Sequence, residues 1–217
     1  MGKSDAGKQD RYAIPDADAK QPHCTITLVR KSKFLAQTCQ CASAGAARAF
    51  VEAIRKINPD ATHNCWAFVA GPPGDTAQIG CSDDGEPRGT AGKPMLNALL
   101  HCGIGQICIV VSRWFGGIKL GTGGLARAYQ EAALTNVASL PVATAVACGN
   151  WRIRAQYDWL PQIRKILPAC EATITDEQYG EAVELGLRAP LDKSRELALA
   201  LAALSNGKIR LLPESDN

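Results

Sequence analysis

The sequence contains no apolar run of about 18 residues, the length that a membrane-spanning helix needs, so no segment is predicted to cross a membrane. It also lacks any Cys-x-x-Cys pair, and Cys39 and Cys41 do not have the usual spacing of zinc ligands. The nine cysteines are odd in number, and we expect no signal peptide before them. We therefore expect buried free thiols in a cytoplasmic protein instead of a disulfide framework.

The sequence also has little net charge. Lysine and arginine number 24 against 21 aspartates and glutamates, which leaves a net charge of +3. This excess is too small to indicate a nucleic-acid partner by itself, so any such argument depends on where the charges lie. The content of 46% apolar and 21% charged residues is typical of a globular protein, here long enough for two modest cores.

Glycine, by contrast, is concentrated in one segment. Residues 80–129 hold eleven of the chain's 20 glycines. Because glycine is favoured where the backbone needs positive φ or close approach, we predict two glycine-rich turns, at 82–93 and 116–124. They flank a buried strand at 107–111, and each precedes a helix. Thr90 is the predicted N-cap of the first helix, and the second is expected from about Leu125 to Leu140.

Both turns combine cationic side chains with the free N–H groups of a helix start, which together favour an anion. We expect them to bind the phosphates of RNA, with Trp114 or Phe115 available to stack on a base. The same glycines would also suit tight turns and close helix packing without a ligand. The candidate residues are Arg88, Gly89, Thr90, Gly92, Lys93, Arg113, Lys119, Gly121, Thr122, Gly123 and Gly124.

The same turns also suit an enzyme that acts on a phosphate ester or a nucleotide, with Asp83 and Asp84 as ligands of Mg²⁺. Pro87 stands where a Walker loop requires glycine, and Pro94 follows Lys93 where that loop requires a hydroxyl. No histidine falls in either turn, so a Ser-His-acid relay is not expected. We assign no catalytic residue and expect no cofactor.

Arg113 ends an apolar strand, so its side chain is expected to be partly buried. A buried guanidinium needs an acidic partner, and Asp83, Asp84 or Glu86 would serve. In that case the two glycine-rich turns form a structural clamp.

The residues in and around these turns resemble a known family. SDDGEPRGTAGKPML at 82–96 and VVSRWFGGIKLGTGGLARAY at 110–129 closely resemble the signature of the IMPACT family, in its bacterial YigZ-type branch, and 31–34 and 63–68 also match. The resemblance covers roughly residues 22–212. It implies a cytoplasmic, translation-associated and non-catalytic role, with RNA or a ribosome-associated protein as partner. A small phosphorylated ligand is the partner that the enzyme alternative implies.

The order of apolar segments predicts two domains. Residues 1–21 and 213–217 are polar and are predicted to be tails, 22–140 to form one domain and 141–212 the other. In the first, the mixed order of elements favours an α+β fold with helices on one face of the sheet. Its strands are expected at 23–30, 33–41, 62–70, 78–81 and 107–111, with a helix at 44–57. The resemblance implies the fold of the second domain of ribosomal protein S5.

The second domain is predicted to be ferredoxin-like, with the order βαββαβ. Strands are expected at 142–155, 170–177, 180–188 and 208–212, and helices at 159–167 and 194–204. The family resemblance implies the same fold, similar to a C-terminal domain of elongation factor G.

A secondary basic face is predicted on this domain. Arg152 and Arg154 alternate along one strand and so share a face, with Arg164 and Lys165 nearby. Sheets of this fold commonly bind RNA across such a face, but the usual aromatic pair is missing. A solvated face with ordinary salt bridges is the other interpretation of these charges.

Overall fold

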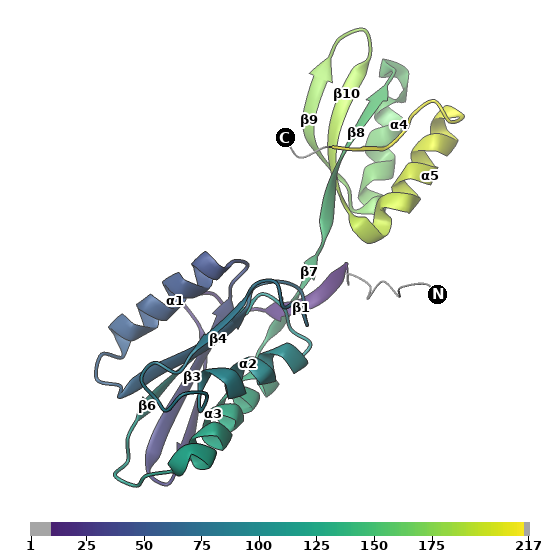
Figure 1. Ribbon diagram of the computed structural model, residues 1–217. Coiled ribbons are helices and arrows are strands. Elements are labelled where there is room, and N and C mark those ends of the chain that lie inside the picture. Colours follow the sequence, from purple (N-terminus) through teal and green to yellow (C-terminus); the bar gives the residue numbers. More distant parts are fainter. Residues whose placement is uncertain (1–9, 215–217) are drawn as a thin grey trace, which may run out of the picture. The chain divides into compact units, whose positions relative to one another are not determined.

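The computed structural model describes residues 10–214, which form two compact units (Figure 1). One unit comprises residues 12–145, and the other comprises residues 146–214 with the two residues that precede Tyr12. Both mix helices with sheets, so the predicted α+β class is confirmed. No helix in the described part of the chain is long and apolar enough to cross a membrane.

The N-terminal domain is built on a five-stranded antiparallel sheet in the order β2-β3-β6-β4-β5. The central strand β6 begins with five apolar residues, 107–111, and is buried between β3 and β4. The bounds are β2 His23–Val29, β3 Ser32–Gln40, β4 His63–Val69, β5 Ile79–Ser82 and β6 Ile107–Trp114.

Helices cover both faces of this sheet, so the prediction of helices on one face is wrong. Helix α1 (Ala44–Ile57) packs on one face, and α2 (Gly92–His101) and α3 (Gly121–Ala138) pack on the other (Figure 1). In β6, Cys108 and Val110 point toward α1, whereas the alternate residues point toward α2 and α3. A strand buried on both faces has no polar alternation, which explains the apolar run at this point of the sequence.

The C-terminal domain has the predicted ferredoxin-like order. Its antiparallel sheet runs β11-β8-β10-β9, and α4 and α5 pack over the buried Ile153, Leu185 and Leu187 (Figure 1). Short 3₁₀ turns flank α4 and precede α5. The bounds are β8 Cys148–Ala155, α4 Leu160–Ile166, β9 Thr173–Tyr179, β10 Val183–Pro190, α5 Ser194–Ser205 and β11 Leu212–Pro213.

The predicted N-terminal tail contains a strand. β1 (Arg11–Pro15) pairs with β7 (Val142–Val146) in a small two-stranded sheet, whereas residues 1–9 lie outside the described part of the chain. The single strand expected at 142–155 is therefore two strands, and they are separated at Ala147, whose N–H donates to the carbonyl of Asp10. At the other end, Pro213 belongs to β11, and residues 215–217 are outside the description.

All nine cysteines are free thiols, as expected, but they are not all buried. Cys24 is exposed on the edge strand β2, and Cys148 is exposed at the start of β8. Cys39, Cys41 and Cys108 lie together in the core beneath α1. Burial was therefore predicted correctly for Cys39, Cys41, Cys65, Cys108 and Cys170 but not for the two exposed thiols.

One glycine allows two loops of the N-terminal domain to touch. A Cβ atom at Gly116, which follows β6, would lie 2.0 Å from the carbonyl carbon of Lys31 in the β2–β3 turn. The N–H of Gly116 also donates to the hydroxyl of Ser32 over 3.2 Å. Only glycine permits this approach, and it brings the β6–α3 loop against the β2–β3 turn.

Gly116→Ala should therefore destabilise the N-terminal domain by about 1–3 kcal/mol, because the added methyl group overlaps backbone atoms. Gly123→Ala is the matched control, since a Cβ atom at Gly123 meets nothing within 4 Å. This control should be neutral or stabilise the domain by up to about 1 kcal/mol, because alanine is the better helix former. Thermal unfolding of both variants gives the comparison; equal melting temperatures would contradict the close approach.

Candidate functional site

The start of α2 is capped by Asp83, not by Thr90. One carboxylate oxygen of Asp83 accepts from the N–H groups of Ala91 and Gly92, each at 2.9 Å, and the other accepts from Gly89 at 2.7 Å. The Thr90 hydroxyl instead donates to a carbonyl three residues earlier. The N–H groups of Gly89, Ala91 and Gly92 are thus satisfied by the protein's own carboxylate and are not free for an external anion. Phosphate binding by the side chains of Arg88 and Lys93 stays a prediction.

Asp83 and Asp84 also have structural partners that differ from the predicted Mg²⁺. Burial raises the pKa of Asp83, but the three backbone N–H groups outweigh burial and hold its pKa below the usual value. Asp84 accepts from Arg55 at 2.6 Å and from the backbone N–H of Asn64 at 2.7 Å. Among the described residues, no three histidine, cysteine or acidic side chains are grouped as metal ligands.

A buried ion pair connects the two glycine-rich segments. The Nη1 atom of Arg113, at the end of β6, lies 2.5 Å from Oε1 of Glu86, and the two side chains are only 7% and 3% exposed. The hydroxyl of Tyr129 on α3 donates to the same oxygen at 2.9 Å. The predicted clamp is confirmed, with Glu86 as the acid among the three that were considered.

Tyr129 completes this buried network. Its pKa is raised by burial and by the neighbouring Cys65 thiol and Glu86 carboxylate, so its hydroxyl remains a donor. The Cys65 thiol donates to the Tyr129 oxygen over 3.3 Å, and burial raises the pKa of that thiol as well. His63 lies at the margin, with its Nε2 atom 4.0 Å from Glu86 Oε1.

A cavity of about 370 Å³ opens beside the ion pair. We call it the Glu86–Arg113 cavity. Its remaining wall comes from the β6–α3 loop and the start of α3, and includes Phe115, Lys119 and Thr122. Of the predicted residues, Arg113, Lys119, Gly121 and Thr122 line this cavity. Arg88, Gly89, Thr90, Gly92 and Lys93, at the start of α2, do not.

Helix α3 starts earlier than predicted, at Gly121 instead of about Leu125. Gly123 and Gly124 are therefore in its first turn and not in a loop. In the described structure no side chain caps this helix, whose N-cap position is Leu120. An uncapped start of an 18-residue helix leaves N–H groups and the positive end of the helix dipole facing outward.

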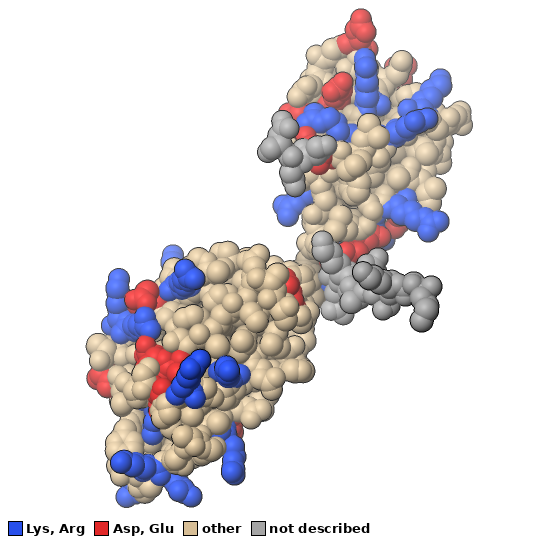
Figure 2. Space-filling view, in the orientation of Figure 1, with Lys and Arg blue, Asp and Glu red and all other residues tan. Residues whose placement is uncertain are grey.

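Three exposed cations lie at this end of the N-terminal domain. Arg30 and Lys31 form the β2–β3 turn, both with positive φ, and Gly116 holds the β6–α3 loop with Lys119 against that turn. Figure 2 shows basic side chains gathered over the end of the domain that carries these two loops in Figure 1. We call Arg30, Lys31 and Lys119 the cationic end.

The sequence analysis missed Arg30 and Lys31. Their signal was the tight turn between two strands, but nothing in the sequence indicated that this turn meets the loop after β6. Trp114, the last residue of β6, and Phe115, the first residue of the loop, differ in exposure. Trp114 is held by Lys33, whose ammonium lies 3.9 Å from the ring centroid, and by Asp60, which accepts from its indole N–H. Phe115 is 47% exposed.

Two of the four residues in the secondary basic face of the C-terminal domain are paired with acids. Arg152 lies 3.5 Å from Asp176 and also binds Glu214, and Arg164 binds Glu177 at 2.9 Å. The alternative of ordinary surface salt bridges describes these two arginines better than an RNA-binding face. Lys165 is exposed on α4.

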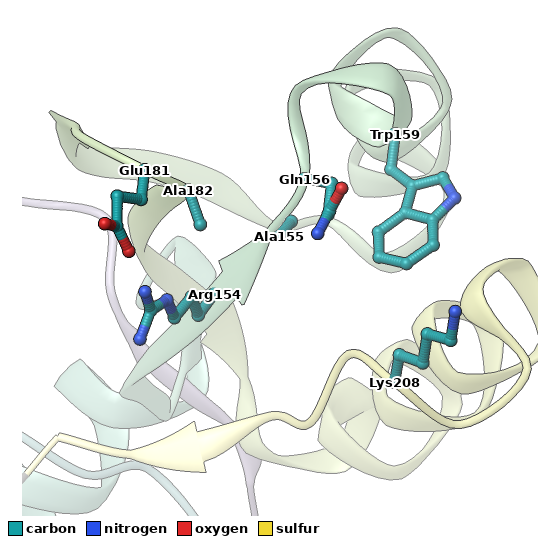
Figure 3. Close-up of a pocket in the computed structure, with 7 residues that line it drawn as sticks. All are labelled: Arg154, Ala155, Gln156, Trp159, Glu181, Ala182 and Lys208. Atoms are coloured by element: carbon teal, nitrogen blue, oxygen red, sulfur yellow. The ribbon is translucent and has the colours of Figure 1, made fainter.

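Arg154 differs from Arg152 because it lines an open cavity of about 440 Å³. Figure 3 shows Trp159 and Lys208 on one side of this cavity and Arg154 near Glu181 on the other. The Lys208 ammonium lies 5.9 Å from the Trp159 ring centroid. One acid and two cations surround this cavity, which gives it less positive character than the cationic end.

Each of the two domains matches a known protein family. The Impact N-terminal domain matches residues 30–137, and a domain of unknown function, DUF1949, matches residues 153–208. IMPACT family member YigZ of Escherichia coli is 39% identical over 203 residues, which cover 94% of this chain and 98% of that protein. IMPACT family member YvyE of Bacillus subtilis is 34% identical over 181 residues, 83% of this chain and 82% of that protein.

A crystal structure described as that of a hypothetical protein has the same arrangement of elements, with a TM-score of 0.71 and 38% identity. It covers 95% of this chain and 98% of its own. The protein is thus of a class with two α+β domains, in which a buried ion pair joins the two glycine-rich segments of the first domain. The chain belongs to the IMPACT family.

Glu86→Gln should destabilise the N-terminal domain by about 3–5 kcal/mol, because it leaves the charge of Arg113 buried without a counter-ion. The double variant Glu86→Leu, Arg113→Met should recover most of that loss, because it removes both charges. Urea denaturation measures each change.

Glu52→Gln is the matched control for the ion pair. Its partner Arg55 lies 2.6 Å away on the exposed face of α1, so the loss should stay below about 1 kcal/mol. If Glu86→Gln lowers the free energy of unfolding by no more than Glu52→Gln does, the buried pair does not hold the two segments together.

Proposed function

We propose that this protein is a translation-associated regulatory protein that binds RNA through the cationic end of its N-terminal domain. The observation that carries the proposal is that three exposed cations, Arg30, Lys31 and Lys119, lie on two loops that touch at Gly116. The second of these loops leads into the uncapped start of α3. Backbone phosphates are the ligands that such a surface suits, since lysine, arginine and helix starts all bind them without reading sequence.

Membership of the IMPACT family gives loose support to the translation-associated part of this proposal. The choice of RNA over a ribosome-associated protein rests on the surface itself. The cationic end combines cations with the exposed ring of Phe115, and an aromatic ring beside cations suits a single-stranded segment of RNA. If binding survives nuclease treatment, the partner is a protein and not RNA.

The alternative of an enzyme acting on a phosphate ester or nucleotide has less support. Its metal site depended on Asp83 and Asp84, and both carboxylates are engaged with backbone N–H groups or with Arg55. Glu86 is likewise engaged with Arg113 and Tyr129. These acids have structural partners, so general acid–base chemistry would first require them to separate.

The triple variant Arg30→Ala, Lys31→Ala, Lys119→Ala should bind RNA more weakly and with a smaller dependence on salt. For single-stranded RNA, each phosphate contact contributes about −0.7 to the slope of log affinity against log salt, so loss of three contacts should reduce the slope by about 2. Filter binding to a mixed RNA pool between about 50 and 200 mM salt measures both quantities.

The matched control is Arg48→Ala, Lys56→Ala, which removes two exposed cations from α1 on the other face of the sheet. It should leave the affinity and its salt slope close to those of the unmodified protein. Equal binding by the triple variant and this control, with both folded, would contradict the proposed surface.

A further inference from the structure

The Glu86–Arg113 cavity contains a buried donor that the protein does not satisfy. Arg113 lines the cavity and is 6% exposed, and its Nε atom has no hydrogen-bond partner among the described residues. Its Nη1 atom is already used by Glu86. A buried N–H without an acceptor is costly, so an acceptor from a ligand would relieve this cost.

The same cavity is lined by the start of α3. Gly121 and Thr122 belong to the first turn of this helix, in which no described side chain accepts from the backbone N–H groups. Lys119 precedes Gly121 by two residues and lines the same cavity. The orphan donor of Arg113 and the helix start are separate observations, and both point to an acceptor with negative charge.

The charge of the cavity limits how much negative charge it would accept. The charge of Arg113 is offset by Glu86, which leaves Lys119 and the partial charge of the helix start. This remaining positive charge balances the negative charge of one phosphate monoester better than that of a diphosphate or triphosphate. An oxygen of a monoester also has enough acceptor sites for several donors at once.

The other walls suit a flat apolar group. Phe115 and Leu120 of the β6–α3 loop, Leu125 of α3 and Pro87 line the cavity. A volume of about 370 Å³ is more than an inorganic phosphate fills and lies within the range of small-ligand sites. The exposed ring of Phe115 offers a surface on which a base would stack.

We propose that the Glu86–Arg113 cavity binds one nucleotide through a terminal phosphate monoester, which contacts the start of α3, Lys119 and the Nε of Arg113. This inference deepens the proposed function and rests on it, because the cavity shares Lys119 with the cationic end. The nucleotide is either free or the 5′-phosphorylated end of an RNA chain. The two sources present the same phosphate and base.

The test compares one short oligoribonucleotide with a 5′-phosphate or a 5′-hydroxyl, alongside AMP and adenosine, in calorimetric titrations of the full chain. The 5′-phosphate should raise affinity about tenfold or more, which corresponds to about 1.4 kcal/mol. Thr122→Glu should abolish this preference, because its carboxylate would occupy the start of α3. An acid in the first turn also suits a helix, so the variant should fold.

Thr135→Glu is the matched control, since it places the same change at an exposed position near the other end of α3. It should keep the full preference for the 5′-phosphate. If AMP binds and the two RNA forms bind equally, the site belongs to free nucleotides.

If RNA binds with a steep salt dependence but without any preference for the 5′-phosphate, and AMP does not bind, this inference is overturned while the proposed function stands. If neither RNA nor AMP binds, both fail. A preference that persists unchanged in Thr122→Glu would also overturn the assignment to this cavity.

Discussion

The ion pair between Glu86 and Arg113 joins two segments that lie 27 residues apart in the chain and buries both charges. Such a pair is costly to desolvate, so it persists only with good geometry and further hydrogen bonds. Tyr129 supplies one of these bonds from α3. The position of α3 relative to the end of β6 therefore depends on this contact, and so does the cavity that lies between them.

The cationic end depends on the same arrangement. The loop after β6 reaches the β2–β3 turn because Gly116 permits backbone contact, and it reaches α3 because Arg113 anchors the end of the strand. Exposed cations on separate loops repel one another, and a rigid frame is needed to hold them together without a ligand. The buried ion pair and the glycine provide that frame, both at the β6 end of the loop that leads to α3.

The strong patterns of the sequence predicted most of the fold. The helix expected at 44–57 has those bounds in the structure, where Ser43 caps it, and the apolar run before Arg113 predicted β6. β1 was not predicted, because a short strand of mixed composition has no periodicity and depends on its partner β7. Long-range pairing of this kind is not visible in local sequence.

The candidate site was predictable in part for the same reason. The charge and glycine content of residues 113–124 indicated an anion site, and Arg113, Lys119 and Thr122 do line one cavity. Asp83, considered as a ligand of Mg²⁺, instead caps α2. An acid next to a glycine-rich turn serves equally as a metal ligand or as a helix cap. Only the folded backbone shows that its carboxylate faces the N–H groups of α2.

The most direct measurement of the central claim is an NMR titration of the ¹⁵N-labelled protein with single-stranded RNA, which locates the contact without any substitution. The account predicts that the largest amide shifts occur in the β2–β3 turn, the β6–α3 loop and the first turn of α3. Shifts confined to β8 and α4 of the C-terminal domain, with none in those three segments, would contradict it.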